Sequence, residues 1–260
     1  FSDSLFLSAG VRQDNNNDFG KHDSYRVSSA YLLALGSSTL KLKASYGSGF
    51  RSPSLFEIAY NSGPFSAPPT SLVSLKEETS KGFEIGLEFF ASEQLNLETV
   101  IFVQEIEDAI YFDLSGFSGY LQDIGKSTSE GVELSGNYSL DDQWELSANY
   151  TYNETERPNG SQRLRRPERL ANLGISYRNN KDRLSVHFFY RVSRNSIDEV
   201  FGSAIPLDDF EVLDLTASYQ VSERLELYGR IENGLNESYS EVTDFLAPER
   251  ASYLGLRVNF

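Results

Sequence analysis

"GFEIGLEFF", residues 82–90, alternates apolar and polar side chains without a break. Successive side chains of a strand point to opposite faces. One face of this segment therefore carries Phe83, Ile85, Leu87 and Phe89. The other carries Glu84, Gly86 and Glu88. The same alternation recurs in "TLKLKASYG" (39–47), "WELSANYTY" (144–152) and "RLSVHFFYRV" (183–192). The second face is too charged to be a protein core, so we expect one face to meet water and the other to meet lipid.

About twelve segments carry this two-residue period, each roughly as long as a tilted strand that crosses a bilayer. They lie near 4–12, 23–35, 38–49, 80–91, 94–112, 127–140, 143–154, 168–179, 183–194, 208–221, 224–239 and 250–260. No helical pattern of comparable length competes. The sequence predicts an all-β fold, an antiparallel transmembrane β-barrel with about twelve strands present. A soluble β-sandwich also alternates, but twelve strands of this length would make it unusually tall.

The connections between these segments alternate in length. Short ones lie at 36–38, 92–94, 141–143, 179–182 and 222–224. Long ones lie at 13–22, 50–79, 113–126, 155–167, 195–207 and 240–249. Short periplasmic turns and long extracellular loops are typical of bacterial outer-membrane barrels. Because a long connection precedes the last strand, we expect the C-terminus at the periplasmic rim.

Composition narrows the function classes. The chain has 260 residues, no cysteine and a net charge of −15. The absence of cysteine removes disulfides, thiolate catalysis and cysteine-based metal sites. The negative charge argues against nucleic acid as a partner, because phosphates would be repelled. Aromatic residues, at 13%, are abundant enough to supply the aromatic girdles of a membrane barrel.

Four stretches carry a family resemblance: 231–260, 46–58 with 74–88, 123–140 and 163–177. "IENGLNESYSEVTDFLAPERASYLGLRVNF" (231–260) resembles the last two strands of TonB-dependent outer-membrane receptors, although Gly234 and Leu235 depart from the pattern. "RLRRPERLANLGISY" (163–177) is particularly similar to vitamin B12 and siderophore receptors. In the segment 74–88, Glu77 stands where the family usually has proline. The chain is identified as a member of this family.

The resemblance implies a barrel of about 22 strands closed by an N-terminal plug. Residues 1–260 would then be the C-terminal portion of the barrel, with the plug domain absent. The implied function is TonB-dependent uptake of a bulky, scarce nutrient such as cobalamin or a ferric siderophore. Implied partners are outer-membrane lipid and lipopolysaccharide, the barrel-assembly machinery, TonB through the missing plug, and the small-molecule ligand. The alternative is a smaller barrel that closes on itself and acts as a porin-like passive channel.

The end of the chain resembles the terminal signal by which the barrel-assembly machinery recognises outer-membrane proteins. The residues that carry this resemblance are Tyr253, Gly255, Val258 and Phe260.

No residue pattern predicts catalysis, a metal or a cofactor, so we expect the protein not to be an enzyme. His22 is expected in a loop and His187 on the polar face of a strand, neither with a nucleophile partner. The acidic segment "RQDNNNDFGKHD" (12–23) lacks the spacing and closing Glu of a calcium loop.

Two long connections hold the candidate ligand-binding residues. The connection 50–79 contains Arg51, Phe56, Tyr60 and Phe65. We expect it to present a rigid aromatic surface without forming a helix or strand. The connection 155–167 supplies Arg163, Arg165 and Arg166, whose forked donors suit carboxylates, phosphates or catecholates. The alternative for these arginines is binding to lipopolysaccharide phosphates or pairing with Glu154, Glu156 and Glu168.

Overall fold

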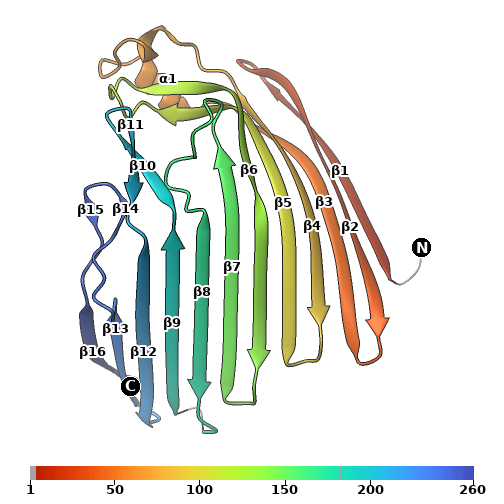
Figure 1. The fold of residues 1–260 in the computed structure, drawn as a ribbon, viewed down its shortest axis with the longest axis vertical. Helices are drawn as coiled ribbons and strands as arrows, with labels where there is room; N and C mark the ends of the chain where they lie inside the picture. The colour runs from red at the N-terminus through yellow and green to blue at the C-terminus, as the bar shows by residue number, and fades with distance from the viewer. Residues whose placement is uncertain (1–3, 182) are drawn as a thin grey trace.

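The computed structural model describes residues 4–181 and 183–260, so Phe1 and position 182 of the predicted turn 179–182 lie outside it. The prediction of about twelve long antiparallel strands is confirmed, because twelve strands form one sheet in the order of the chain (Figure 1). These are β1 (Leu5–Asn16), β2 (Gly20–Leu35), β3 (Ser38–Arg51), β4 (Glu78–Phe90), β5 (Leu95–Phe112), β6 (Tyr120–Ser139), β7 (Trp144–Glu156), β8 (Arg169–Arg178), β9 (Leu184–Arg194), β12 (Phe210–Ser222), β13 (Leu225–Glu232) and β16 (Ala251–Val258).

The long connections contain more regular structure than the sequence predicted. The connection expected to lack helix and strand holds α1 (Leu55–Asn61) and the 3₁₀ turn η1 (Thr70–Leu72). Two further connections fold into small hairpins: β10 (Ser196–Val200) with β11 (Ser203–Leu207), and β14 (Ser240–Val242) with β15 (Phe245–Leu246).

Three local expectations were wrong. The strand expected over 224–239 ends at Glu232, because Asn233 takes a left-handed backbone with φ 49° and leaves the ladder. The strand expected over 127–140 begins earlier, at Tyr120. His22 lies on β2 rather than in a loop, because β1 and β2 continue pairing up to Asn16 and Gly20.

The strand register separates two faces of the sheet. Residues directly opposite one another in an antiparallel pair point to the same side. One row runs across five strands and is apolar throughout: Leu146, Ile175, Phe188, Leu215 and Ile231. Leu42 lies opposite Leu87 on the same side, whereas Lys41 opposite Glu88 belongs to the other. We call these sides the apolar face and the polar face.

The apolar face has no second layer of protein against it. Leu254 on this face is 94% exposed and Ile101 is 58% exposed. Among the described residues the buried hydrophobic side chains are Leu75, Phe210 and Val212, far fewer than a sandwich of this size would need. The apolar face therefore has to be covered by something other than the described chain.

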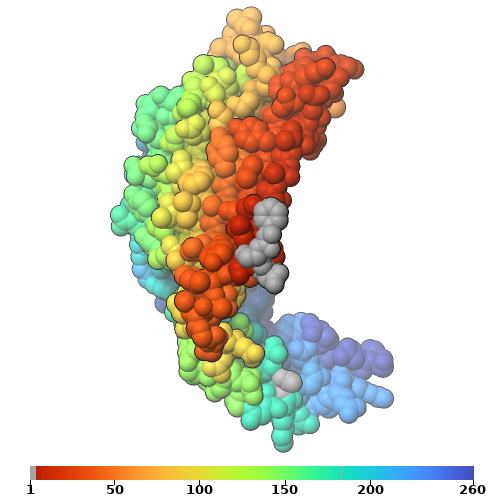
Figure 2. Space-filling model, turned by 90° about the vertical axis from the view of Figure 1, so that its right-hand side faces the viewer, coloured from red at the N-terminus to blue at the C-terminus, as the bar shows by residue number. Residues whose placement is uncertain are grey.

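The sheet is a curved wall, hollow on one side, with its first and last strands at opposite margins (Figure 2). β1 pairs with β2 alone and β16 pairs with β13 alone, so both are edges of the described sheet. The described residues do not form the self-closed twelve-stranded barrel of the alternative prediction.

The connections predicted to be short lie together at one end of the strands, which we call the short-turn end, and α1 and the two hairpins lie toward the other, the long-loop end (Figure 1). The prediction of a long connection over 13–22 was wrong: β1 and β2 are joined at the long-loop end by a tight turn of residues 17–19, because they pair up to Asn16 and Gly20. Among the described residues no helix is both long enough and apolar enough to cross a membrane.

Candidate functional site

The helix α1 is specified by a capping box at the long-loop end. The Ser54 hydroxyl accepts a hydrogen bond from the Glu57 N–H at 3.2 Å, and the Glu57 carboxylate accepts one from the Ser54 N–H at 2.6 Å. This reciprocal pair satisfies two N–H groups that the first turn of a helix leaves free. The stretch "SLFE" (54–57) carries the spacing of this motif, and the sequence prediction overlooked it.

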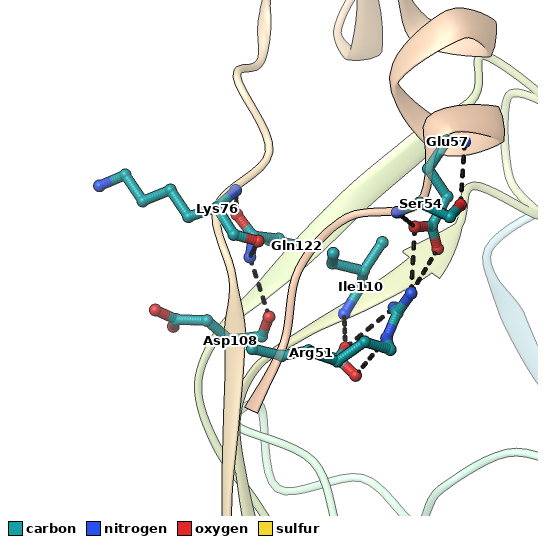
Figure 3. Close-up of polar contacts among 8 residues, drawn as sticks. Arg51, Ser54, Glu57, Lys76, Asp108, Ile110 and Gln122 are labelled. Carbon is teal, nitrogen blue, oxygen red and sulfur yellow. Dashed lines mark hydrogen bonds and ion pairs between the residues drawn. The ribbon is translucent and has the colours of Figure 1, made fainter. Parts of the chain in front are cut away.

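Arg51 anchors α1 to the sheet (Figure 3). Its guanidinium donates to both Glu57 oxygens at 3.0 Å, and to the Glu78 oxygens on β4 at 2.6 and 3.1 Å. Glu78 also accepts the N–H of Ile110 on β5 at 2.7 Å. Three strands and one helix thus meet at Arg51, whose donors face two carboxylates of the protein itself. A role for Arg51 in ligand binding stays a prediction.

The far end of α1 is fixed to β6. The Asn61 amide donates to the Tyr120 carbonyl at 2.7 Å and accepts from the Tyr120 N–H at 2.8 Å. Close by, fully buried Thr70 donates to the carbonyls of Ala67 and Ser118. Gly119 has a φ of 138°, and a Cβ at this position would lie only 2.7 Å from the Asn61 side-chain oxygen. Glycine therefore allows the backbone to approach Asn61 this closely. The connection 50–79 is therefore rigid.

Aromatic rings from α1, β5, the β5–β6 connection, β6 and the β10–β11 turn come together here. We call this group the aromatic cluster: Phe56, Tyr60, Phe112, Phe117, Tyr120 and Phe201. Tyr60 lies at its centre, 5.7 Å from the Phe112 ring and 5.8 Å from the Tyr120 ring. Phe117 and Phe201 continue it toward the β10–β11 hairpin, with ring centroids 6.1 Å apart. Phe56 is 65% exposed and Phe201 73%, so the cluster presents apolar surface at the long-loop end.

Two of the four predicted residues of the connection 50–79, Phe56 and Tyr60, belong to the aromatic cluster. Phe65 is exposed and has no ring contact among the described residues. No sequence pattern pointed to Phe112, Phe117, Tyr120 and Phe201, which come from other connections and strand ends.

The segment 157–168 is held by carboxylates, one of them buried and two half-buried. Arg157 pairs with Asp123 at 2.8 Å and with Glu199 at 3.5 Å. Arg165 donates from Nε to Asp198 Oδ1 at 2.8 Å, and Asp198 is completely buried. These carboxylates are not the Glu154, Glu156 and Glu168 that the sequence suggested as partners, because the segment folds across β6 and the β10–β11 hairpin.

Several donors act on the Asp198 carboxylate. Burial acts to raise its pKa, but hydrogen bonds from the Thr243 N–H, Arg165 and the Glu199 N–H outweigh burial, so the pKa lies below its ordinary value. Arg165 itself has a left-handed backbone, φ 56°, and its N–H donates to the Ile197 carbonyl at 2.7 Å. The side chain and the backbone of Arg165 together hold the segment 157–168 in position.

Arg163 and Arg166 differ from their neighbours. Neither has an ion-pair partner within the part of the chain that the structure describes. Burial lowers the pKa of Arg163 below its ordinary value and the nearby charge of Arg166 lowers it further, while Glu78 opposes both. Both arginines line a cavity of about 350 Å³, which we call the arginine pocket; its wall includes Ile110, Tyr111, Phe112 and Leu114.

The histidines make ordinary contacts. His22 hydrogen-bonds the Phe19 carbonyl at 2.7 Å and stacks on Phe50, and His187 hydrogen-bonds the Ser176 hydroxyl at 3.0 Å. Over residues 4–181 and 183–260, no group of three His, Asp or Glu side chains is placed to hold a metal ion.

The residues of the terminal motif lie along the last strand, β16, and just beyond its end. Gly255 lies opposite Tyr228, where a Cβ would come 2.4 Å from the ring. Tyr253 packs under Arg230, whose guanidinium carbon is 4.3 Å from the ring centroid. Val258 ends β16, and Phe260 beyond it is fully exposed.

Comparison with known proteins matches this architecture. The family model described as "TonB dependent receptor-like, beta-barrel" matches residues 1–233. The vitamin B12 transporter BtuB of Photobacterium profundum is 26% identical over 253 residues, 95% of this chain and 39% of the relative. BtuB of Vibrio cholerae (strain M66-2) is 24% identical, over 98% of this chain and 40% of the relative. The chain spans about two fifths of the length of the curated relatives it matches.

Solved structures share the fold. The ferripyoverdine receptor of the Pseudomonas aeruginosa outer membrane superposes with a TM-score of 0.75 and 19% identity, covering 100% of this chain and 37% of the receptor. The siderophore receptor PiuA of Acinetobacter baumannii superposes with a TM-score of 0.75 and 19% identity, covering 99% of this chain and 41% of that receptor.

Proposed function

The chain belongs to the family of TonB-dependent receptor-like β-barrels, and we propose that it forms part of the barrel of an outer-membrane receptor that takes up a bulky nutrient such as cobalamin or a ferric siderophore. Relatives of this chain are transporters and receptors rather than enzymes. Further strands of the protein pair with the free edges of β1 and β16 and so complete the proposed barrel. Residues 1–260 form the C-terminal portion of that barrel. A plug elsewhere in the protein closes the lumen and contacts TonB.

The apolar face supports placement in a lipid bilayer. On β7 its row runs from Trp144 to Tyr152, about nine residues of strand, and a tilted strand needs about 9–11 residues to cross the bilayer. Trp144 and Tyr177 pack together at the short-turn end with ring centroids 4.6 Å apart, as in an aromatic girdle. We place the short-turn end and Phe260 in the periplasm, and the long-loop end outside the cell, where lipopolysaccharide surrounds it.

The observation that carries the proposed function is the rigid aromatic cluster beside the arginine pocket at that outer end. Phe112 belongs to the cluster and also lines the pocket, so the two form one continuous surface. Apolar rings and arginines are the usual anchors of binding sites. We propose that Phe56, Tyr60 and Phe65 contact the nutrient, that Arg163 and Arg166 bind its anionic groups, and that Arg51 and Arg165 hold the connections in position.

Binding titrations with the full-length receptor test this proposal. One variant combines Phe56→Ala, Tyr60→Ala and Phe65→Ala, and the other combines Arg163→Gln, Arg165→Gln and Arg166→Gln. Phe245→Ala, an exposed aromatic on β15 outside the cluster, is the control. A corrinoid should lose affinity mainly in the aromatic variant, and an anionic ferric siderophore mainly in the arginine variant. Undiminished affinity in both variants for every cargo that binds would place recognition outside these connections.

A further inference from the structure

Two large aromatic residues at the long-loop end occupy backbone positions that usually belong to glycine or asparagine. Phe117 has a φ of 52° and Phe201 a φ of 47°. Phe201 is the first residue of the two-residue turn between β10 and β11, where a positive φ favours Asn, Asp or Gly. Phe117 closes a single helical turn, because its N–H donates to the Asp113 carbonyl at 3.0 Å, and glycine is usual at such an end. A bulky side chain in this left-handed region strains the backbone.

The folded state gains little from these two side chains. Phe117 and Phe201 are both more than half exposed, and their rings meet edge to face with centroids 6.1 Å apart. One aromatic pair of this kind stabilises a protein by less than two strained residues cost. Stability therefore does not explain why phenylalanine stands at both positions. Strained residues that the fold does not need are typical of switching elements.

The two elements that carry these rings are braced separately. The turn 113–119 is held by the buried carboxylate of Asp113, which accepts four hydrogen bonds from residues 115–118. The β10–β11 hairpin is held by Asp198. Between residues 114–119 and 200–203, all of which the structure describes, no hydrogen bond or ion pair is formed. The ring contact thus joins two rigid elements and can open without unfolding either of them.

The two elements also contribute to the lining of the arginine pocket. Leu114 precedes Phe117 by three residues and Glu199 precedes Phe201 by two, and both line this cavity. The elements lie close together, since a Cβ on Gly202 would come 2.7 Å from the Ser115 hydroxyl oxygen. Separation of the two elements would therefore move residues of the pocket lining apart.

We infer that the contact between Phe117 and Phe201 is a latch that controls access to the arginine pocket. In the closed state, which the structure shows, the rings hold the turn 113–119 against the tip of the β10–β11 hairpin. In the open state the rings separate, each element keeps its own bracing, and the pocket is wider. The part that the pocket plays in uptake rests on the proposed function, whereas the latch and the access that it controls do not.

Thiol labelling of the full-length receptor in outer-membrane vesicles measures this access. Residues 1–260 contain no cysteine, so Leu114→Cys places a single thiol on the pocket wall, in a receptor from which any cysteine elsewhere has been removed. The probe is a water-soluble maleimide. Phe117→Asn and Phe201→Asn each remove one ring and supply a residue that tolerates a positive φ. Each variant should be labelled about two- to tenfold faster, which is the shift that loss of one aromatic pair gives to a two-state equilibrium.

Three further measurements separate a latch from a purely structural contact. The variant that combines Phe117→Asn and Phe201→Asn should be labelled no faster than the faster single variant, because both changes remove the same contact. Phe245→Asn, which removes an exposed ring on β15, should leave the rate unchanged. Hydrogen-exchange protection over 196–207 should be retained or increased in Phe201→Asn, because asparagine suits the turn.

An unchanged labelling rate in either single variant, or additive increases in the combined variant, would overturn the inference. Faster labelling together with lost protection over 196–207 would also overturn it, because the ring would then hold the hairpin together rather than latch it. A receptor that shows the latch but accumulates no nutrient would refute the proposed function alone. A receptor that accumulates nutrient but shows no latch would refute this inference alone.

Discussion

Arg165 Nε lies 2.8 Å from Asp198 Oδ1, and this carboxylate joins three long connections. Arg165 precedes β8, Asp198 lies in the β10–β11 hairpin, and the Thr243 N–H from the β14–β15 hairpin donates to the second oxygen at 2.8 Å. The partners are 33 and 45 residues from Asp198 in the sequence. Loops at this end are therefore coupled in one network.

Asp198→Asn should loosen all three connections together. The amide keeps one acceptor oxygen and turns an NH₂ group toward N–H donors, which costs about 1–3 kcal/mol at a buried site. Limited proteolysis of the receptor in outer-membrane vesicles should show faster cleavage in 157–168, 195–209 and 233–250. Asp208→Asn, which removes an exposed charge in the same connection, is the control. Faster cleavage at only one segment would contradict the coupling.

The same network should depend on pH in a defined direction. The pKa of Asp198 is lowered in the folded protein, so the stabilisation is fully present above the ordinary carboxyl pKa of about 3.9. It is lost as the pH falls through the lowered folded value. Hydrogen exchange of the β10–β11 amides should be pH-independent, after correction for intrinsic rates, from about pH 5 to 8, with protection lost below about pH 4. Loss of protection near neutral pH would show that another group controls the hairpin.

Gly119→Ala should dislodge α1. Its φ of 138° is unfavourable for alanine by about 1–3 kcal/mol, and the new Cβ would meet Asn61 Oδ1 at 2.7 Å. We expect lower hydrogen-exchange protection in 55–61 and weaker cargo binding. Gly82→Ala on β4, where a Cβ meets nothing within 4 Å, should leave both unchanged. Equal behaviour of the two variants would refute the anchoring role of Asn61.

Ala148→Arg should destabilise the inserted barrel by about 2–4 kcal/mol, because Ala148 lies midway along the β7 apolar row and would expose a charge to lipid. Ser147→Arg is the matched control, since Ser147 is the adjacent residue on the polar face, opposite Gly174 and Asn137. Denaturant titrations in lipid vesicles measure the difference. Similar losses in both variants would mean that the two faces meet the same environment.

Deletion of Phe260 should lower the amount of inserted receptor without changing cargo affinity. Phe260 is fully exposed beyond the end of β16, at the end of the molecule opposite the aromatic cluster. We therefore propose that it serves recognition by the assembly machinery rather than transport. Phe260→Tyr should restore insertion if an aromatic ring is what is recognised. Quantifying folded receptor in outer-membrane fractions decides this, and normal insertion after the deletion would remove Phe260 from the proposed signal.

The strands were predictable from the sequence because two different environments act on alternate side chains. The row from Trp144 to Tyr152 and its polar counterpart each match one environment along the whole strand. All twelve long strands were therefore found, but their ends were less predictable, and β6 and β13 each differ from the expectation by about seven residues at one end. The turn lengths also identified which ends lie together. The helix α1 was missed although Ser54 and Glu57 carry the capping-box spacing, because a helix of 7 residues is too short to show a long periodic pattern.

The site was predictable only in part. Aromatic residues and arginines marked the correct connections, but the alternation of residues contains no information on which charges pair across loops. Asp198 is remote in sequence from Arg165, and the two partners of Arg51 come from different elements. The distinction between anchored Arg51 and Arg165 and the unpaired Arg163 and Arg166 depends on these distant contacts.

Uptake of a radiolabelled ferric tris-catecholate by cells that carry the full-length receptor tests the uptake function most directly, when measured with and without TonB. The account predicts saturable, energy-dependent accumulation that disappears without TonB while binding at the cell surface remains. Accumulation that does not saturate and proceeds equally well without TonB would contradict it and identify a passive channel.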